Sequence, residues 1–213
     1  MKKVVIMGIL ICVLCSLLVS AGSKFILKVN STEPISPQQA IEDLLSHPYV
    51  LYFKLGVYYF YQNKFDDAIH AFKKAIELKP DFAEAYHNIG VSYYKQNNLD
   101  DAIAQFQKSI EVQDTYVTGH FSLALAYYEK KEYDLALSEF KKVVELNPQN
   151  VDALFNLGII YVEKFRANNE KNGEDLQQAL EYYTLCLKVN QNYPDARENK
   201  EIVKNVLQEL TTQ

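Results

Sequence analysis

The sequence predicts an all-α fold, a solenoid built from stacked pairs of antiparallel helices. Three kinds of residue recur every 34 positions: a small residue, an alanine and a phenylalanine. Their members are Gly56, Gly90, Ala124 and Gly158, then Ala68, Ala102 and Ala136, and finally Phe72, Phe106 and Phe140. Self-similarity at a fixed period of roughly 20–50 residues is typical of repeat architectures. Residues 83–116 show one unit clearly, because a polar turn at 96–98 joins two amphipathic helical patterns there.

The composition is that of an ordinary globular chain. Its 213 residues are 48% hydrophobic and 23% charged, and the net charge is -5. A nucleic-acid partner requires a basic face, which this balance argues against. Of the three cysteines, Cys12 and Cys15 lie in an apolar N-terminal run and only Cys186 lies downstream, so no disulfide framework is expected.

Residues 1–29 are predicted to form a membrane anchor or a signal peptide. Val4–Ala21 is a run without a charge, and as a helix it would span about 27 Å of a hydrocarbon core about 30 Å thick. The length favours a retained anchor, since signal peptides have apolar regions of about 7–15 residues. Small residues at 19–21 permit cleavage after Ala21, so a cleaved signal peptide stays open.

The charges beside this run indicate a topology. Lys2 and Lys3 precede it together with the terminal amine, and Lys24 and Lys28 follow it. The slight excess of positive charge at the front favours a cytoplasmic N-terminus. We therefore expect extracytoplasmic repeats, tethered through residues 4–21 to a bacterial inner membrane and facing the periplasm. Cleavage near Ala21 would instead give a secreted chain.

Residues 30–36 are interpreted as a polar spacer ahead of an N-terminal packing helix at 37–48. Ser36-Pro37 suits the start of a helix, with a capping residue followed by proline in the first turn. Ile41, Leu44 and Leu45 give this helix one apolar stripe. We expect the stripe to cover the open end of the first repeat.

Four repeats follow, at 49–82, 83–116, 117–150 and 151–192. Numbered from these starts, they share an apolar–small pair at the seventh and eighth places, tyrosine at the eleventh, alanine at the twentieth and an aromatic ring at the twenty-fourth. The residues are Leu55-Gly56, Ile89-Gly90, Leu123-Ala124 and Leu157-Gly158; Tyr59, Tyr93, Tyr127 and Tyr161; Ala68, Ala102, Ala136 and the displaced Ala179; and Phe72, Phe106, Phe140 and Tyr183. With Pro80 and Pro148 closing two units, this pattern resembles the tetratricopeptide repeat family.

The resemblance implies a right-handed superhelical solenoid of antiparallel helix pairs. Two positions depart from the family pattern: Asp114 lacks the closing proline, and His120 stands where an aromatic residue is usual. In the fourth repeat, the distance from Tyr161 to Ala179 is 18 residues where the other repeats have nine. The insertion, near 165–178, either lengthens both helices or forms a protruding loop. Such a loop would be a tolerated surface feature or a partner contact.

Residues 193–213 are predicted to contain a C-terminal capping helix over 194–210. Its apolar residues fall on one stripe, consisting of Ile202, Val203, Val206, Leu207 and Leu210. Lys200-Glu201 stands where a fifth repeat would place Leu-Gly. A terminal helix with one polar face suits the end of a solenoid.

No set of residues indicates catalysis. The sequence has no glycine-rich phosphate loop, no HExxH and no GxSxG motif. His87 and His120 have no carboxylate companion in the pattern, and the acidic pairs at 66–67 and 100–101 are explained by the dipoles of the helices they begin. We therefore expect no enzyme, no cofactor, no metal site and no small-molecule substrate.

The family resemblance also implies a binding groove, because the first helices of such repeats line a concave wall that holds a peptide or a helix. The fifth, ninth and twelfth places are among those that face the partner. Here they hold aromatic and aliphatic residues with one histidine: Phe53, Val57, Phe60, His87, Val91, Tyr94, Phe121, Leu125, Tyr128, Phe155, Ile159 and Val162.

This composition argues against one known groove type. Family members that clamp a C-terminal carboxylate place lysine and arginine where this chain has Phe53, Val57, Thr118 and Ser122, and only Asn88 matches them. We therefore expect a membrane-tethered or exported scaffold that holds a peptide or amphipathic helix of a protein partner, as in assembly of an envelope or secretion complex. The alternative is a receptor for targeting sequences on an organelle outer membrane, with cytosolic repeats. An enzyme subunit that uses His87 or His120 is a further hypothesis.

Overall fold

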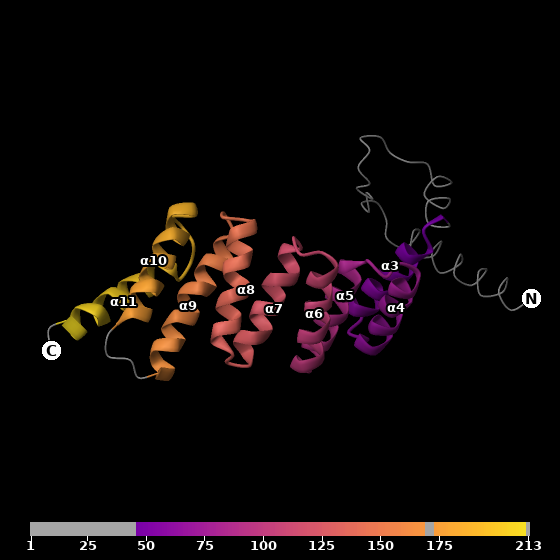
Figure 1. The fold of residues 1–213 in the computed structure, drawn as a ribbon, viewed down its shortest axis with the longest axis horizontal. Coiled ribbons are helices and arrows are strands. Elements are labelled where there is room, and N and C mark those ends of the chain that lie inside the picture. Colours follow the sequence, from indigo (N-terminus) through magenta and orange to yellow (C-terminus); the bar gives the residue numbers. More distant parts are fainter. Residues whose placement is uncertain (1–45, 169–172, 212–213) are drawn as a thin grey trace, which may run out of the picture. The chain divides into compact units, whose positions relative to one another are not determined.

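The computed structural model describes residues 46–168 and 173–211. Over these ranges the chain forms helices α3 to α11 and no strand, which confirms the predicted all-α class (Figure 1). The predicted anchor or signal peptide at 1–29, the spacer at 30–36 and nearly all of the packing helix at 37–48 lie outside the described residues. None of the helices described combines the length and apolar character needed to cross a membrane.

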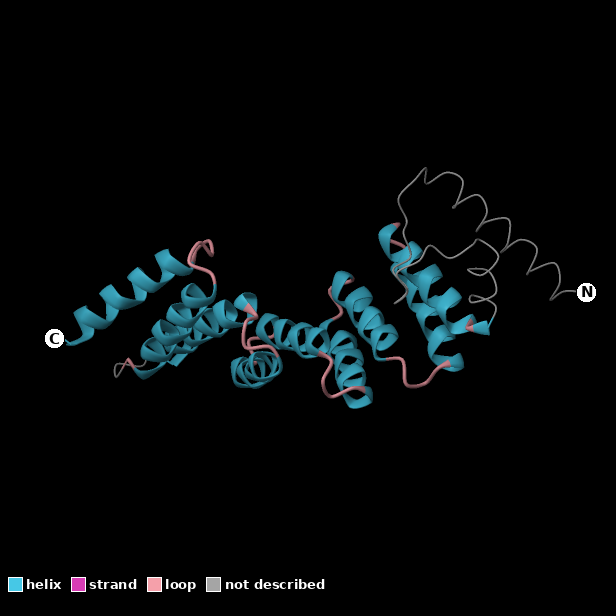
Figure 2. Ribbon diagram, turned by 90° about the horizontal axis from the view of Figure 1, so that it is seen from above, coloured by secondary structure: helices cyan, strands magenta, loops and turns pink. Residues whose placement is uncertain are grey.

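The helices form four consecutive antiparallel pairs and a final single helix. The pairs are α3 (Pro48–Tyr61) with α4 (Phe65–Leu78), α5 (Ala83–Lys95) with α6 (Leu99–Val112), α7 (Val117–Glu129) with α8 (Tyr133–Leu146), and α9 (Val151–Asn168) with α10 (Glu174–Val189). Each helix packs on the one before it, and α11 (Ala196–Thr211) packs on α10. Figures 1 and 2 show the pairs following one another in chain order. The predicted solenoid of helix pairs is confirmed, while its handedness stays a prediction.

The small residue at the eighth place brings each first helix against an aromatic ring of its partner. A β-carbon added to Gly90 would lie 2.6 Å from the Phe106 ring, closer than real side chains approach. The same addition would lie 2.5 Å from the ring of Phe72 at Gly56 and of Tyr183 at Gly158. The predicted close approach is therefore confirmed at three repeats, and the rings are the predicted residues of the twenty-fourth place.

The two departures from the repeat pattern, Asp114 and His120, are joined by a hydrogen bond. The His120 Nε2 atom lies 2.9 Å from the backbone carbonyl oxygen of Asp114. Its Nδ1 atom lies 2.6 Å from a carboxylate oxygen of Glu139 on α8. The expectation that His120 has no carboxylate companion was wrong, because Glu139 is 19 residues away in the sequence and meets the ring only when α7 and α8 pair.

The insertion in the fourth repeat lengthens both of its helices. α9 has 18 residues where α5 and α7 have 13, and α10 has 16 where α4, α6 and α8 have 14. Residues 169–172 between them lie outside the described ranges. Gly173, at the predicted turn, has a φ of +72°, a left-handed conformation that glycine adopts readily. Asn63, Asn97 and Lys131 occupy the left-handed region in the turns of the other three repeats.

The C-terminal helix covers the end of the fourth repeat much as predicted. Val203 is buried, and Val206, Leu207 and Leu210 pack against the main core. Ile202 differs from the prediction, since its side chain is 51% exposed. It lies at the edge of the stripe, one residue before Val203, and a helix turns by about 100° per residue.

We predict that Gly90→Leu lowers the free energy of unfolding by about 1–3 kcal/mol, because the new side chain would overpack the seam against Phe106. Chemical denaturation followed by circular dichroism measures this loss. The control is Ala104→Leu on the exposed side of α6, which we expect to change stability by no more than about 0.5 kcal/mol. Equal stability of the two variants would contradict the importance of the seam.

Candidate partner-binding surface

The first helices of the first three repeats lie next to each other in turn. α3 contacts α5, and α5 contacts α7. Across the second contact, the His87 Nε2 atom lies 2.9 Å from the Ser122 hydroxyl oxygen, and the Tyr94 hydroxyl donates to Glu129 over 3.4 Å. The fifth and twelfth places of the second repeat are therefore beside the sixth and thirteenth places of the third. This is the arrangement that a continuous wall of first helices requires.

The twelve predicted groove residues all pack partly into the repeat cores. Eleven are half-buried, and His87 is buried. Those of the first repeat, Phe53, Val57 and Phe60, pack against the small core around Phe72. Val91 and Tyr94, and all six groove residues of the third and fourth repeats, pack against the main core. Apart from the buried His87, the groove residues are thus neither covered completely nor fully in solvent.

The fifth place has a packing role that recurs in every repeat. Its side chain contacts the aromatic ring of the twenty-fourth place in the same helix pair, with ring centroids 5.2–5.8 Å apart. The pairs are Phe53 with Phe72, His87 with Phe106, Phe121 with Phe140, and Phe155 with Tyr183. Such ring pairs contribute about 0.5–1.5 kcal/mol beyond their burial. The fifth-place residues therefore serve the helix pair as well as any partner.

Two carboxylates stand beside the tyrosines of the twelfth place. Burial, and then the carboxylate of Glu129, raises the pKa of Tyr94. Burial, and then the carboxylate of Glu163, raises the pKa of Tyr128. Glu163 also forms an ion pair of 2.7 Å with Arg166, whose side chain is largely exposed. In the second and third repeats, the tyrosines of the twelfth place are thus flanked by carboxylates.

His87 is the one buried polar member of the set. Burial lowers its pKa to about 4, so the ring is neutral near pH 7. The ring also contacts Tyr116 with centroids 5.5 Å apart. A neutral ring enclosed by Phe106, Tyr116 and Ser122 is a packed residue. Over the residues that the structure describes, no three His, Cys, Asp or Glu side chains are grouped to hold a metal ion.

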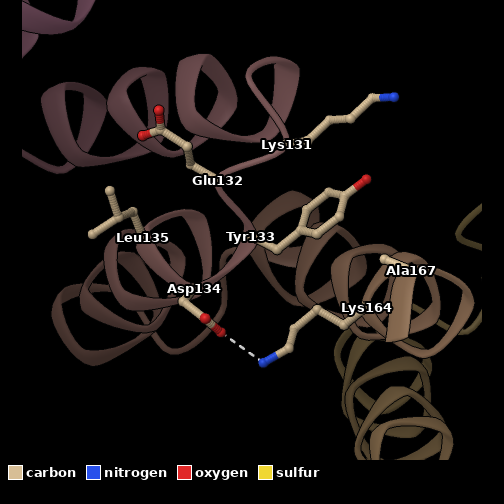
Figure 3. Close-up of a pocket in the computed structure, with 7 residues that line it drawn as sticks. All are labelled: Lys131, Glu132, Tyr133, Asp134, Leu135, Lys164 and Ala167. Carbon is tan, nitrogen blue, oxygen red and sulfur yellow. Dashed lines mark hydrogen bonds and ion pairs between the residues drawn. The ribbon is translucent and has the colours of Figure 1, made fainter. Parts of the chain in front are cut away.

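A hollow of about 370 Å³ lies beside the third repeat, at the turn between α7 and α8 (Figure 3). Its walls carry both signs of charge, and Lys164 of α9 donates to Asp134 of α8 over 2.6 Å. Figure 3 shows the amine of Lys131 and the hydroxyl of Tyr133 pointing away from that pair. The ring of Tyr133 is 6.1 Å from that of Tyr128, so the hollow adjoins the predicted groove residues.

Sequence reasoning missed a polar link that joins successive repeats. The aspartate at the eighteenth place of one repeat accepts a hydrogen bond from the side chain at the fourteenth place of the next repeat. The pairs are Asp66 with Gln96, Asp100 with Lys130, and Asp134 with Lys164, at 2.6–2.8 Å. Asp66 and Asp100 do lie in the first turns of α4 and α6, as predicted, but the same side chains also reach the neighbouring repeat. A recurrence at a spacing of 30 residues was the available signal.

Models of known repeat families match the part of the chain that forms the helix pairs. A model described as TPR repeat matches residues 56–97 and 125–164. A model described as tetratricopeptide repeat matches residues 83–116. No curated protein matches the sequence.

Several solved structures share the fold. A crystal structure of the MamA protein has a TM-score of 0.66 at 21% identity, covering 78% of this chain and 88% of that one. PilF of Pseudomonas aeruginosa has a TM-score of 0.62 at 20% identity, covering 76% and 69%. The first TPR of Spaghetti (RPAP3), bound to the HSP90 peptide SRMEEVD, has a TM-score of 0.51 at 21% identity, covering 53% and 89%. At these identities the likeness concerns the fold alone.

The buried neutral His87 predicts a pH dependence of stability. The unfolded chain binds a proton at this ring near its ordinary pKa of 6.5, whereas the folded chain does so only near 4. The free energy of unfolding is therefore highest above pH 6.5 and falls as the pH drops toward 4. The other three repeats have phenylalanine at this place. We expect His87→Phe to reduce the acid-induced fall in the free energy of unfolding by about 3 kcal/mol or less.

Denaturation at a series of pH values measures the effect. The control is His70→Phe on the exposed face of α4, which should leave the pH dependence unchanged. If His87→Phe follows the same pH profile as the unaltered chain, the burial of a neutral His87 is contradicted.

Proposed function

Because this chain is a tetratricopeptide repeat protein, we propose that it is a protein-interaction scaffold whose first helices hold a segment of a partner in an apolar groove. The groove is formed by the ninth and twelfth places of the four repeats, with the fifth place beneath them. The partner segment is a peptide or an amphipathic helix with large apolar side chains.

The observation that carries the proposal is the recurrence of half-buried apolar residues at the ninth place. Val57, Val91, Leu125 and Ile159 occupy it in turn, and each is partly accessible while it packs against a core. The contacts of α3 with α5 and of α5 with α7 support one continuous surface over the first three of these residues. Rows of accessible apolar side chains are commonly contact sites for partners.

The chemistry of the wall separates this groove from a carboxylate clamp. A structure of similar fold holds an HSP90 peptide, which supports a peptide or protein partner in general terms. In this chain the places of the clamp carry Phe53, Val57, Thr118 and Ser122. The proposed partner therefore binds through apolar side chains rather than through a C-terminal carboxylate.

We further propose that the repeats are exported or tethered through residues 4–21 and that they take part in assembly of an envelope or secretion complex. The support is the uncharged run at 4–21 and the excess of lysine ahead of it. The alternative is an organelle receptor for targeting sequences, with its repeats in the cytosol. The proposed mode of binding is the same in both.

The test of the groove is the double substitution Val91→Asp with Leu125→Asp in the full chain. Two carboxylates in the middle of the apolar wall should weaken partner capture at least tenfold, a loss of about 1.4 kcal/mol, because the partner's apolar groups would then meet charge. The measurement is quantitative affinity capture with mass spectrometry, beside circular dichroism to show that the helices persist.

A matched control adds the same two charges to the second helices, as Ala104→Asp with Ser138→Asp, at positions that are exposed on α6 and α8. Capture should be unaffected there. The proposal that partners bind in the groove would be refuted if both variants lost the partners equally or if both retained them.

For topology, we expect protease added to bacterial spheroplasts that carry the full chain to cleave the repeats. A chain that lacks residues 4–21 should stay protected inside the cells, as should a cytoplasmic marker protein. Protection of the full chain under the same conditions would reject the exported form and favour repeats that face the cytosol.

A further inference from the structure

The junction between the third and fourth repeats differs from the two junctions before it in the residue types at three places of the later repeat. Three places of the later repeat characterise each junction: the fourth place of its first helix and the twenty-sixth and twenty-ninth places of its second helix. The first junction has Tyr86 with Lys108 and Glu111, and the second has His120 with Lys142 and Glu145. Counting the nine inserted residues, the third junction has Leu154 with Leu185 and Lys188.

An ion pair within the second helix recurs in the first three repeats. Lysine at the twenty-sixth place pairs with glutamate at the twenty-ninth, at 2.7, 2.7 and 3.1 Å in turn. The pairs are Lys74 with Glu77, Lys108 with Glu111, and Lys142 with Glu145. In the fourth repeat the lysine is replaced by Leu185 and the glutamate by Lys188. The change removes one ion pair and leaves an apolar side chain and a cation in its place.

The residues that replace the ion pair lie beside one hollow. A hollow of about 520 Å³ is lined by Val144, Pro148, Leu154, Leu185 and Val189, with Lys188 beside them. Its volume is within the range of about 300–1,000 Å³ that is typical of binding pockets. Leu185 is 37% exposed and Val189 is 43% exposed. Among the described residues, no carboxylate is paired with Lys188.

We infer that this hollow is a second docking site, which receives an acidic amphipathic segment of a protein partner. A large apolar side chain of the segment packs on Leu185 and Val189, over the buried Leu154, and a carboxylate on the neighbouring turn pairs with Lys188. The ion pair that the other repeats make internally is here completed by the partner. Because both charges are partly desolvated in such a contact, the pair also selects against a basic segment.

The hollow and the groove select for different partners. The hollow is formed by the ends of α8, α9 and α10 and contains none of the groove residues. In the third and fourth repeats, Glu129 and Glu163 flank the groove tyrosines and disfavour an acidic segment there. The charge of a probe peptide therefore distinguishes the two sites.

The decisive variant is Leu185→Lys with Lys188→Glu, which rebuilds the ion pair of the other three repeats. The probe is a fluorescein-labelled synthetic amphipathic peptide with leucine along one face and glutamate along the other. Its counterpart has lysine in place of every glutamate. Fluorescence anisotropy with the purified full chain should show that the acidic probe binds at least tenfold more weakly to the variant and that the unaltered chain prefers the acidic probe to the basic one.

Two controls locate the effect. Lys108→Glu with Glu111→Lys reverses the equivalent pair of the second repeat, and Val91→Asp with Leu125→Asp alters the groove; neither should weaken the acidic probe. Circular dichroism checks the fold, and Lys188→Glu alone, expected to weaken the acidic probe several-fold, decides the matter if the double variant unfolds. The inference is overturned if the unaltered chain does not bind the acidic probe, if the basic probe binds as well, or if only the groove variant loses binding.

Discussion

The close approach of the two helices within each repeat is the constraint on which the rest of the structure depends. A glycine on α3, α5 and α9 leaves room for the ring of Phe72, Phe106 or Tyr183 to lie against the backbone of the first helix. At these three positions even a methyl group would overlap the ring as it lies, whereas the third repeat has Ala124 at the same place. With the pair fixed at this distance, the fifth-place side chain meets the same ring from the first helix. The seam therefore positions one of the three rows of the candidate groove.

The junctions between repeats vary while the seams stay constant. At the second junction Asp114 replaces the closing proline and His120 replaces the usual aromatic residue. A hydrogen bond between them, together with Glu139, keeps the ring nitrogens of the buried His120 satisfied. At the third junction, an apolar hollow takes the place of such polar contacts. Successive repeats are also joined by the short polar links from the fourteenth place to the eighteenth. A solenoid tolerates this variation because each repeat contacts only its neighbours.

The two proposed binding surfaces differ in the charge beside their apolar side chains. The wall of first helices has aliphatic and aromatic side chains, with carboxylates beside the tyrosines of the second and third repeats. The hollow at the end of the second helices offers apolar side chains with a single lysine. A scaffold that brings two partners together needs separate sites that reject each other's ligand, and charge provides that rejection at modest cost in affinity.

Periodicity in the sequence was enough to determine the helix pairs, the seam residues and the end of the solenoid. A period of 34 residues with small, alanine and aromatic places leaves few other folds, since those places have to meet in every copy. The displaced Ala179 and Tyr183 were correctly aligned across the insertion for the same reason, and both are buried. Only the tertiary structure placed Glu139 against His120 and brought Leu154, Leu185 and Lys188 to one hollow. Contacts between different helices depend on how the helices and repeats pack, and residues 19, 31 or 34 positions apart carry no local signal of meeting.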